Sequence, residues 1–318
     1  MTDAAAPNTD TARPVAAEVV CLASFNADLS SRVARPPARG ETLLASGFGI
    51  GPGGKGSNAA VACARQGARV AVLARIGQDD FGRMALRLWA SEGIACTAVE
   101  QAAGEPTGVA QIWVYPDGDN SIAVAPGAGA GLDAGHARAA AGLIRQARVL
   151  MEPNEVPSAA TLAAFGIARQ AGVTTVLNPA PARPLPPGLL ALCDLLTPNE
   201  TELRALAGLG PQAPLDAAAA AVLAQGAGAV LATLGAAGCA LYRPGQPVLR
   251  LPGHAVAVAD TVGAGDTFTG ALAAALARGL ALPDALRWAN AAAALSVTCP
   301  GAIAGMPTLA AVARLLGG

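Results

Sequence analysis

Short apolar runs alternate with longer segments whose apolar residues recur every three or four positions, from residue 18 to the end of the chain. The short runs predict buried strands, and the longer segments predict helices. We expect strands at 19–23, 69–74, 148–152, 174–177, 195–196 and 229–234. We expect helices at 59–66, 83–92, 134–146, 158–170, 200–206, 216–225, 266–278, 284–298 and 308–316. Repeated strand–helix units predict an α/β fold: a three-layer sandwich with helices on both faces of a mainly parallel central sheet.

Two segments interrupt this alternation. Residues 32–50 are punctuated by Pro and Gly, and residues 96–124 hold β-type runs around a hairpin signal at 116–120. Together they predict a small, discontinuous antiparallel sheet outside the main one, a pattern typical of a closing lid. We therefore expect one α/β domain over 18–318 with these lid segments inserted, preceded by a disordered tail over 1–17.

Composition narrows the classes of function. The net charge is -1 and charged residues make up 14% of the chain, so there is no basic surface for nucleic acid. No run of about 20 apolar residues predicts a membrane span, and the first residues do not resemble a secretory signal. Two histidines, His136 and His254, are too few for a histidine-based metal site or triad. Scattered single cysteines favour reduced thiols in a cytoplasmic protein over disulfides or zinc: Cys21, Cys63, Cys96, Cys193, Cys239 and Cys299.

A turn of small residues precedes the apolar helix expected from residue 266. Gly263, Ala264 and Gly265 place Asp266 in the first helical turn. The first amides of a helix lack intrahelical partners, and glycine lets an anion approach the backbone, so this turn predicts a phosphate site. An acid beside a bound phosphate is explained if it is the general base for an attacking hydroxyl. The alternative is that Asp266 only caps the helix.

A second glycine-rich turn, residues 49–58, also leads into a helix. It departs from the dinucleotide-binding motif, because no acid follows about 20 residues later to hold a ribose. It departs from the Walker motif, because Gly56 stands where Ser or Thr would bind magnesium. Lys55 is the only lysine in the chain and has glycines on both sides. This favours a functional role for Lys55 and Asn58 over an ordinary exposed lysine.

Polar residues follow several expected strands. Asn26 and Asp28 lie two positions apart after the first strand, so both would point the same way, and an amide with a carboxylate suits the hydroxyls of a polyol. A simple Asn/Asp turn is the alternative. Each later strand end could also be an ordinary loop. Five such loops at the carboxyl ends of strands predict a cleft. They are residues 26–28, 154–155, 178–181, 197–202 and 233–235.

These strings resemble the signatures of the ribokinase-like sugar kinases. The similarity is carried by residues 24–28, 53–58, 178–183, 199–202 and 260–266, and it extends from about residue 18 to the end. The resemblance implies ATP-dependent transfer of the γ-phosphate to the primary hydroxyl of D-ribose, giving ribose 5-phosphate. It also implies Mg²⁺ as a cofactor and a homodimer that pairs through the lid.

The resemblance also implies a role for individual residues. Asp266 would take the hydroxyl proton, and the amides of Gly263, Ala264 and Gly265 would form an anion hole. Residues implied to hold the sugar are Asn26, Asp28, Gly54, Lys55, Asn58 and Glu155. Residues implied to lie along the nucleotide are Asn199, Thr233, Gly235, Gly238 and Asn290, with Glu202 ordering the magnesium–phosphate assembly. An insertion-like segment, 152–155, leaves the register of Glu155 open by a residue or two.

A monovalent cation site is implied beside the anion hole. The matching positions, expected to hold K⁺ and so to fix the turn, are Asp260 and the carbonyls of Val262, Ser296, Cys299 and Gly301. One position departs from the family pattern, because Gly305 stands where a serine ligand is common.

Other functions remain compatible with the same strings. A kinase of the same fold could act on deoxyribose, fructose, a keto-deoxy sugar acid or a nucleoside, although Asn26 and Asp28 favour a small neutral sugar. A non-catalytic sugar or nucleotide sensor is a remote alternative, because Asp266 and the glycines before it are present. An NAD-dependent enzyme would need the missing ribose-binding acid.

Overall fold

The computed structural model describes residues 16–317, so the tail expected over 1–17 lies almost wholly outside the described part of the chain. The main body is a nine-stranded sheet in the order β13-β12-β11-β10-β9-β8-β1-β4-β5. Its strands are β1 (Val19–Leu22), β4 (Val70–Gly77), β5 (Ala95–Ala102), β8 (Val149–Pro153), β9 (Thr174–Asn178), β10 (Leu195–Leu196), β11 (Ala229–Thr233), β12 (Cys239–Tyr242) and β13 (Leu249–Leu251). The seven strands from β11 to β5 are parallel, and β12 and β13 add an antiparallel edge.

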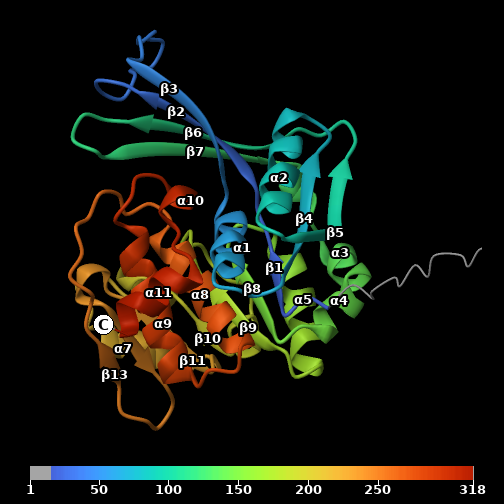
Figure 1. Ribbon diagram of the computed structural model, residues 1–318, viewed down its shortest axis with the longest axis vertical. Helices are drawn as coiled ribbons and strands as arrows, with labels where there is room; N and C mark the ends of the chain where they lie inside the picture. Colours follow the sequence, from blue (N-terminus) through green and yellow to red (C-terminus); the bar gives the residue numbers. More distant parts are fainter. Residues whose placement is uncertain (1–15, 318) are drawn as a thin grey trace, which may run out of the picture.

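Helices cover both faces of this sheet (Figure 1). One face packs against α1 (Lys55–Arg65), α2 (Asp80–Ser91), α8 (Ala264–Ala277), α9 (Leu282–Ser296) and α11 (Leu309–Gly317). The other packs against α3 (Ala134–Ala139), α4 (Ala141–Gln146), α5 (Ser158–Gln170), α6 (Glu200–Leu206) and α7 (Leu215–Leu223). The two faces bury separate apolar clusters, which confirms the three-layer α/β sandwich expected from the sequence.

A second sheet of four strands, the lid, lies over one end of the main body (Figure 1). Its order is β3-β2-β6-β7, with β2 (Asn26–Arg32), β3 (Gly47–Gly53), β6 (Thr107–Val114) and β7 (Asn120–Gly127). The hairpin expected around 116–120 joins β6 and β7, which pair antiparallel. Because β2 follows β1 directly, the lid is attached at the carboxyl ends of the parallel strands, where α/β proteins bind ligands.

The structure corrects the expected lid in three respects. The strand Ala95–Ala102 pairs in parallel with β4, so this part of the segment expected over 96–124 belongs to the main sheet. Strands β2 and β6 are parallel rather than antiparallel, because the chain passes through α1, β4, α2 and β5 between them instead of turning back in a hairpin. Of the segment expected over 32–50, the residues from 33 to 46 form no strand, and β2 and β3 extend beyond its two ends.

Helices α1 and α8 pack backbone to backbone. A Cβ at Gly270 of α8 would lie 2.3 Å from the carbonyl oxygen of Ala59, so only glycine permits this approach. Most of α8 is buried, which makes it the central helix of its layer. Within residues 16–317 we find no helix that is both long enough and apolar enough to cross a membrane.

Candidate active site

The start of α8 forms the turn expected from the sequence. Gly263 is the N-cap residue in the left-handed conformation, with φ of 79°, and has no side chain to cap the helix. The amide of Ala264 makes a long bond of 3.3 Å to the Thr261 carbonyl, whereas the amide of Gly265 has no acceptor among residues 16–317. The positive end of the helix dipole and a free amide therefore meet at one point, which suits an anion.

Asp266 is not a helix cap. Its side chain is only 5% exposed, and its Oδ2 accepts a hydrogen bond of 2.9 Å from the Asn58 amide group on α1. Burial raises the pKa of Asp266, Lys55 and Asn58 act to lower it, and the net pKa lies above the ordinary value of 3.8. A buried carboxylate with a raised pKa, held next to an anion site, has the position and basicity of a general base.

Lys55 lies among carboxylates rather than on an open surface. Burial acts to lower the pKa of its ammonium group, but Asp266, Glu155 and Glu202 together raise the pKa above its ordinary value. A lysine held in the charged form within this cluster is not an ordinary exposed lysine. The alternative of a purely solvated side chain is therefore wrong.

Glu155 faces the same site. Its Oε2 accepts a hydrogen bond of 2.6 Å from the Ser24 hydroxyl and one of 2.9 Å from the main-chain amide of Lys55. The Ser24 hydroxyl also accepts from the Gly56 amide at 3.1 Å. Glu152, three residues earlier, is fully buried in the opposite apolar layer beneath α5, where burial raises its pKa well above the ordinary value. Of the two acids in the insertion-like segment, Glu155 is the one beside Lys55.

Asn26 and Asp28 begin strand β2 of the lid, so the alternative of a simple turn is wrong. A Cβ at Gly53 would lie 2.2 Å from a carboxylate oxygen of Asp28, and one at Gly108 would lie 2.4 Å from Oδ1 of Asn26. The glycines thus leave room for both side chains. Burial first, then the charges of Glu155 and Asp266, raises the pKa of Asp28 from 3.8 to about 6.

Asn199 and Thr233, two of the residues expected along the nucleotide, lie at the carboxyl ends of β10 and β11. Asn199 and Glu202 form a reciprocal capping box at the start of α6, each side chain accepting from the other's amide at 2.9 Å. The main chain of Asn199 forms an isolated parallel β-bridge with that of Thr233, at the end of β11. Burial raises the pKa of Glu202, against hydrogen bonds from Asn199 and the charge of Lys55.

The turn after β11 contains two more of the residues expected along the nucleotide. Gly235 and Gly238 have φ of 56° and 95°, and a Cβ at Gly238 would lie 2.1 Å from the Leu251 carbonyl. Asn290, on α9, is buried, and its amide group donates to the Pro252 carbonyl at 2.8 Å. Only glycine fits at position 238, because the turn packs there against the backbone of residues 251–253.

Two loops meet beside the Gly263 turn. The carboxylate of Asp260 accepts from the amide of Val262 at 3.0 Å and from the amide of Gly301 at 2.8 Å. This one side chain therefore joins the segment before α8 to the loop after α9.

Two of the carbonyl groups expected to hold K⁺ lie beside Gly305. A Cβ at Gly305 would lie 2.3 Å from the Ser296 carbonyl oxygen and 3.2 Å from that of Cys299. Main-chain carbonyls with one carboxylate form a donor set that fits a monovalent cation. Within residues 16–317 no group of three or more His, Cys, Asp or Glu side chains is arranged to hold a metal ion.

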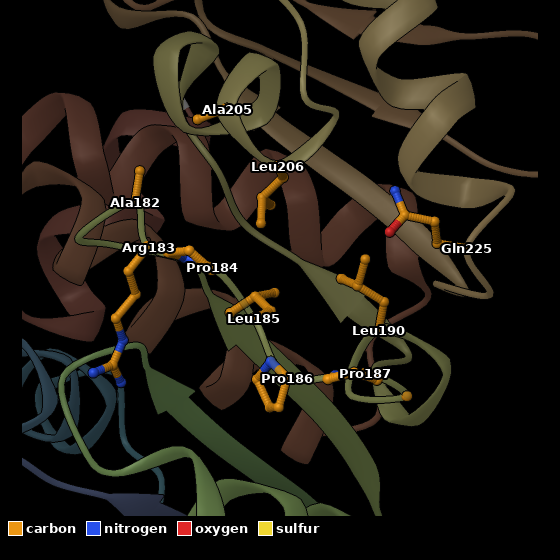
Figure 2. A pocket seen from close by; sticks show the side chains of 11 residues that line it. Ala182, Arg183, Pro184, Leu185, Pro186, Pro187, Leu190, Ala205, Leu206 and Gln225 are labelled. Carbon is orange, nitrogen blue, oxygen red and sulfur yellow. The ribbon is translucent and has the colours of Figure 1, made fainter.

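Cavity volume alone does not identify the site. A cavity of about 440 Å³ lies between the loop 182–188 and α6, and it is lined mainly by apolar side chains such as Leu185 and Leu206 (Figure 2). It contains none of the acids described above. A smaller cavity of about 230 Å³ adjoins Asn26 and Glu155. The cluster of titratable groups at the start of α8, rather than the larger cavity, has the chemistry of an active site.

Comparison with known proteins places the chain in a family. Its sequence matches the pfkB family of carbohydrate kinases over residues 16–309. It is 40% identical over 289 residues to a ribokinase of Haemophilus influenzae, covering 90% of this chain and 94% of the relative. A Mus musculus ribokinase is 38% identical, covering 92% of each chain. A ribokinase of Arabidopsis thaliana, solved in complex with ribose and ATP, matches with a TM-score of 0.89 at 32% identity, covering 96% of this chain and 100% of that one.

The chain belongs to the pfkB family of carbohydrate kinases. This confirms the family, the fold class and the class of activity expected from the sequence. The structure adds residues that the sequence did not single out. Ser24 links Glu155 to the start of α1, and Arg65 and Gln66 hold the loop after α9. In the sequence, Ser24 could have been found by its position two residues before Asn26. No pattern in the sequence pointed to Arg65.

Proposed function

We propose that this protein is an ATP-dependent ribokinase, which transfers the γ-phosphate of ATP to the primary hydroxyl of D-ribose and yields ribose 5-phosphate. The observation that carries the proposal is the buried Asp266 carboxylate, held by Asn58 beside the free amide of Gly265. The ribokinase relatives and the solved complex with ribose and ATP support this choice of substrates.

Asp266 acts as the general base. It accepts the proton of the sugar's primary hydroxyl at Oδ1, because Oδ2 is occupied by the Asn58 amide group. The amides at the start of α8 stabilise the negative charge that develops on the transferred phosphoryl group. Thr267 fixes this turn, since its amide and hydroxyl both donate to the Gly263 carbonyl, at 2.8 and 2.9 Å.

The sugar is held by residues from both sheets. Asp28 and Glu155 accept hydrogen bonds from hydroxyl groups, while Asn26, Lys55 and Asn58 donate, and Gly54 allows close approach of the sugar to the backbone. Gly54 has φ of 92°, and a Cβ there would lie 2.8 Å from the Ser24 carbonyl, so no other residue fits.

The nucleotide lies along Asn199, Thr233, Gly235, Gly238 and Asn290. Asp28, Glu155, Glu202 and Asp266 together outnumber the charge of Lys55, so a polyanionic nucleotide enters a site of like charge. Mg²⁺, when bound to the phosphates, neutralises this charge and stabilises the transition state. Glu202 would order the water around that ion.

The loops joined by Asp260 provide a site for K⁺ together with the carbonyls of Val262, Ser296, Cys299 and Gly301. A bound K⁺ supplies a fixed positive charge beside the turn. Gly305 contributes no side-chain oxygen, so the site has one protein ligand fewer than a serine would give. We expect KCl to activate turnover and to raise the melting temperature more than NaCl of equal ionic strength. Equal effects of the two salts would argue against the site.

The lid is proposed to close over the sugar and to form a homodimer. Asp28 is paired across the sheet with Val124 through Ala110, so these side chains share the face toward the sugar. Phe48 and Ile50 lie on the other face and are 66% and 52% exposed, a surface that suits a second copy of the chain. We expect Phe48→Asp to give monomers in sedimentation velocity while Leu209→Asp, an exposed position off the lid, does not. A wild-type monomer would remove the dimer from the proposal.

A cytoplasmic location is also part of the proposal. All six cysteines are free thiols and four of them are buried, a state that a reducing compartment maintains.

The decisive experiment combines a sugar panel with one substitution. Coupled ADP release should be fastest with ribose among ribose, deoxyribose, fructose and adenosine. Asp266→Asn should reduce kcat by at least about 10²-fold, the usual scale for a general base, and leave ribose binding nearly unchanged. Asp284→Asn, the same change in the first turn of α9, should have no effect on turnover. Faster turnover of another sugar would reassign the substrate, and an active Asp266→Asn variant would remove Asp266 from the mechanism.

A further inference from the structure

The C-terminal end of α1 holds a loop that borders the active site. The Arg65 guanidinium donates through Nη1 to the carbonyls of Ile303, at 2.6 Å, and Met306, at 3.1 Å. Its Nε and Nη2 donate to the Glu92 carboxylate at 2.6–3.2 Å. The next residue, Gln66, donates to a third carbonyl, that of Pro307, at 2.7 Å. Two consecutive side chains therefore bind three carbonyls of one short segment.

That segment contains α10 (Ala302–Gly305), whose other side contacts the anion-binding turn. A Cβ at Gly263 would lie 2.9 Å from the Cβ of Ala302, so the first residue of α10 packs directly on the N-cap of α8. The residue before α10, Gly301, donates its amide to Asp260. Helix α10 thus lies between Arg65 and the Gly263 turn and contacts both.

A helix of four residues has little structure of its own to hold it. Only Gly305 of α10 is fully buried, and its apolar contacts are those of the partly buried Ile303 and of Met306, which enters the core directly after the helix. Hydrogen bonds from a charged donor are stronger than those between neutral groups, and Arg65 is itself oriented by its bidentate pair with Glu92. The position of α10 therefore depends on the Arg65 guanidinium as well as on these apolar contacts.

We propose that Arg65 is a positioning residue for phosphoryl transfer, which acts through α10 to hold the Gly263 turn and its amides in place. The inference rests on the proposed kinase function. Helix α1 carries Lys55 and Asn58 in its first turn and Arg65 at its other end, about 15 Å away at 1.5 Å per residue. One helix therefore sets the geometry on both the sugar side and the phosphate side of the reaction.

The test separates kcat from KM. We expect Arg65→Met to lower kcat at least tenfold while the KM for ribose changes less than twofold, because the sugar-binding residues lie at the far end of α1. Arg65→Lys should recover part of kcat, since an ammonium group can reach one carbonyl but cannot bridge two carbonyls and Glu92. The matched control is Arg169→Met, which removes another arginine–carboxylate pair, with Asp194, remote from α10 and should leave kcat unchanged.

A second measurement does not depend on turnover. Amide hydrogen exchange of the unliganded protein should become faster over residues 260–266 and 301–306 in Arg65→Met, and not in Arg169→Met. If Arg65→Met fails to fold, Glu92→Gln weakens the ion pair that orients Arg65 and should show the same changes with smaller amplitude. Unchanged exchange over 260–266, or a fall in kcat matched by an equal rise in KM, would overturn the inference. An inactive wild-type protein would instead contradict the proposed function.

Discussion

Asp28→Asn is expected to stabilise the unliganded protein while weakening its affinity for sugar. Asp28 is partly buried on β2 against Gly53, with Glu155 and Asp266 near enough to repel it. Burial and these charges raise its pKa from 3.8 to about 6. Asparagine has nearly the same shape and carries no charge. It therefore removes the cost of burying a charge and the repulsion by Glu155 and Asp266 without a new clash.

The magnitude follows from the shift in pKa. The folded state holds the Asp28 proton more tightly than the unfolded chain, so it binds more protons between about pH 4 and pH 6. The free energy of unfolding therefore falls as pH rises through that window. A shift of about two units corresponds to about 3 kcal/mol. Asp28 is partly exposed, and screening by water reduces this to about 1–2 kcal/mol at pH 7.5.

The same substitution should weaken the binding of ribose. A carboxylate that accepts hydrogen bonds from hydroxyl groups contributes about 1.5–3 kcal/mol, which corresponds to an increase in the KM for ribose of about 10- to 150-fold. The gain in stability and the loss of affinity have one cause, because the charge that the empty site disfavours is the charge that the sugar needs.

Urea unfolding at pH 7.5, 6 and 4.5 without ligands measures the first effect, and coupled ADP release measures the second. Asp117→Asn, the same change in the exposed hairpin turn of the lid, should alter stability by less than about 0.5 kcal/mol at every pH. A variant that is no more stable than the wild type at pH 7.5, or a gain that persists unchanged at pH 4.5, would refute this reasoning.

Two further predictions concern the contact between α1 and α8. Asn58→Leu removes the hydrogen-bond donor 2.9 Å from Asp266, so burial should raise the pKa of Asp266 further. The acid limb of the kcat/KM profile should then move to higher pH, and turnover at pH 7 should fall by about tenfold. An acid limb that does not move would contradict this prediction. Gly270→Ala places a Cβ 2.3 Å from the main chain of α1 and should lower the free energy of unfolding by about 1–3 kcal/mol in urea. Gly166→Ala in α5, with nothing within 4 Å, should instead stabilise by about 0.4–1 kcal/mol, and equal effects of the two changes would argue against close packing at Gly270.

Local patterns predicted the elements whose causes are local. Helices α5 and α6 match the expected ranges to the residue, because apolar periodicity and the Asn199–Glu202 capping box specify them within the segment itself. The helix expected over 134–146 divides at Ala140 into α3 and α4. Strands β12 and β13 were missed because both are short and lack strong periodicity.

The sequence pattern did not predict which strands pair with one another. An edge strand such as β5 alternates in exposure much as a lid strand does, so only its register with β4 assigns it to the main sheet. The open register of Glu155 had the same origin. Only the hydrogen bonds from the Ser24 hydroxyl and the Lys55 amide show that the Glu155 carboxylate faces the site.

The sequence alone determined that an acid follows a glycine turn at the start of an apolar helix, that a lone lysine lies among glycines, and that strands alternate with helices. These are local facts of spacing. The tertiary structure decided that Asp266 accepts from Asn58, 208 residues away, and that the charges of Asp266, Glu155 and Glu202 act on Lys55. It also decided that Arg65 binds the loop beside the anion site. Basicity and orientation arise from burial and from contacts between distant segments, and neither is a property of a stretch of sequence.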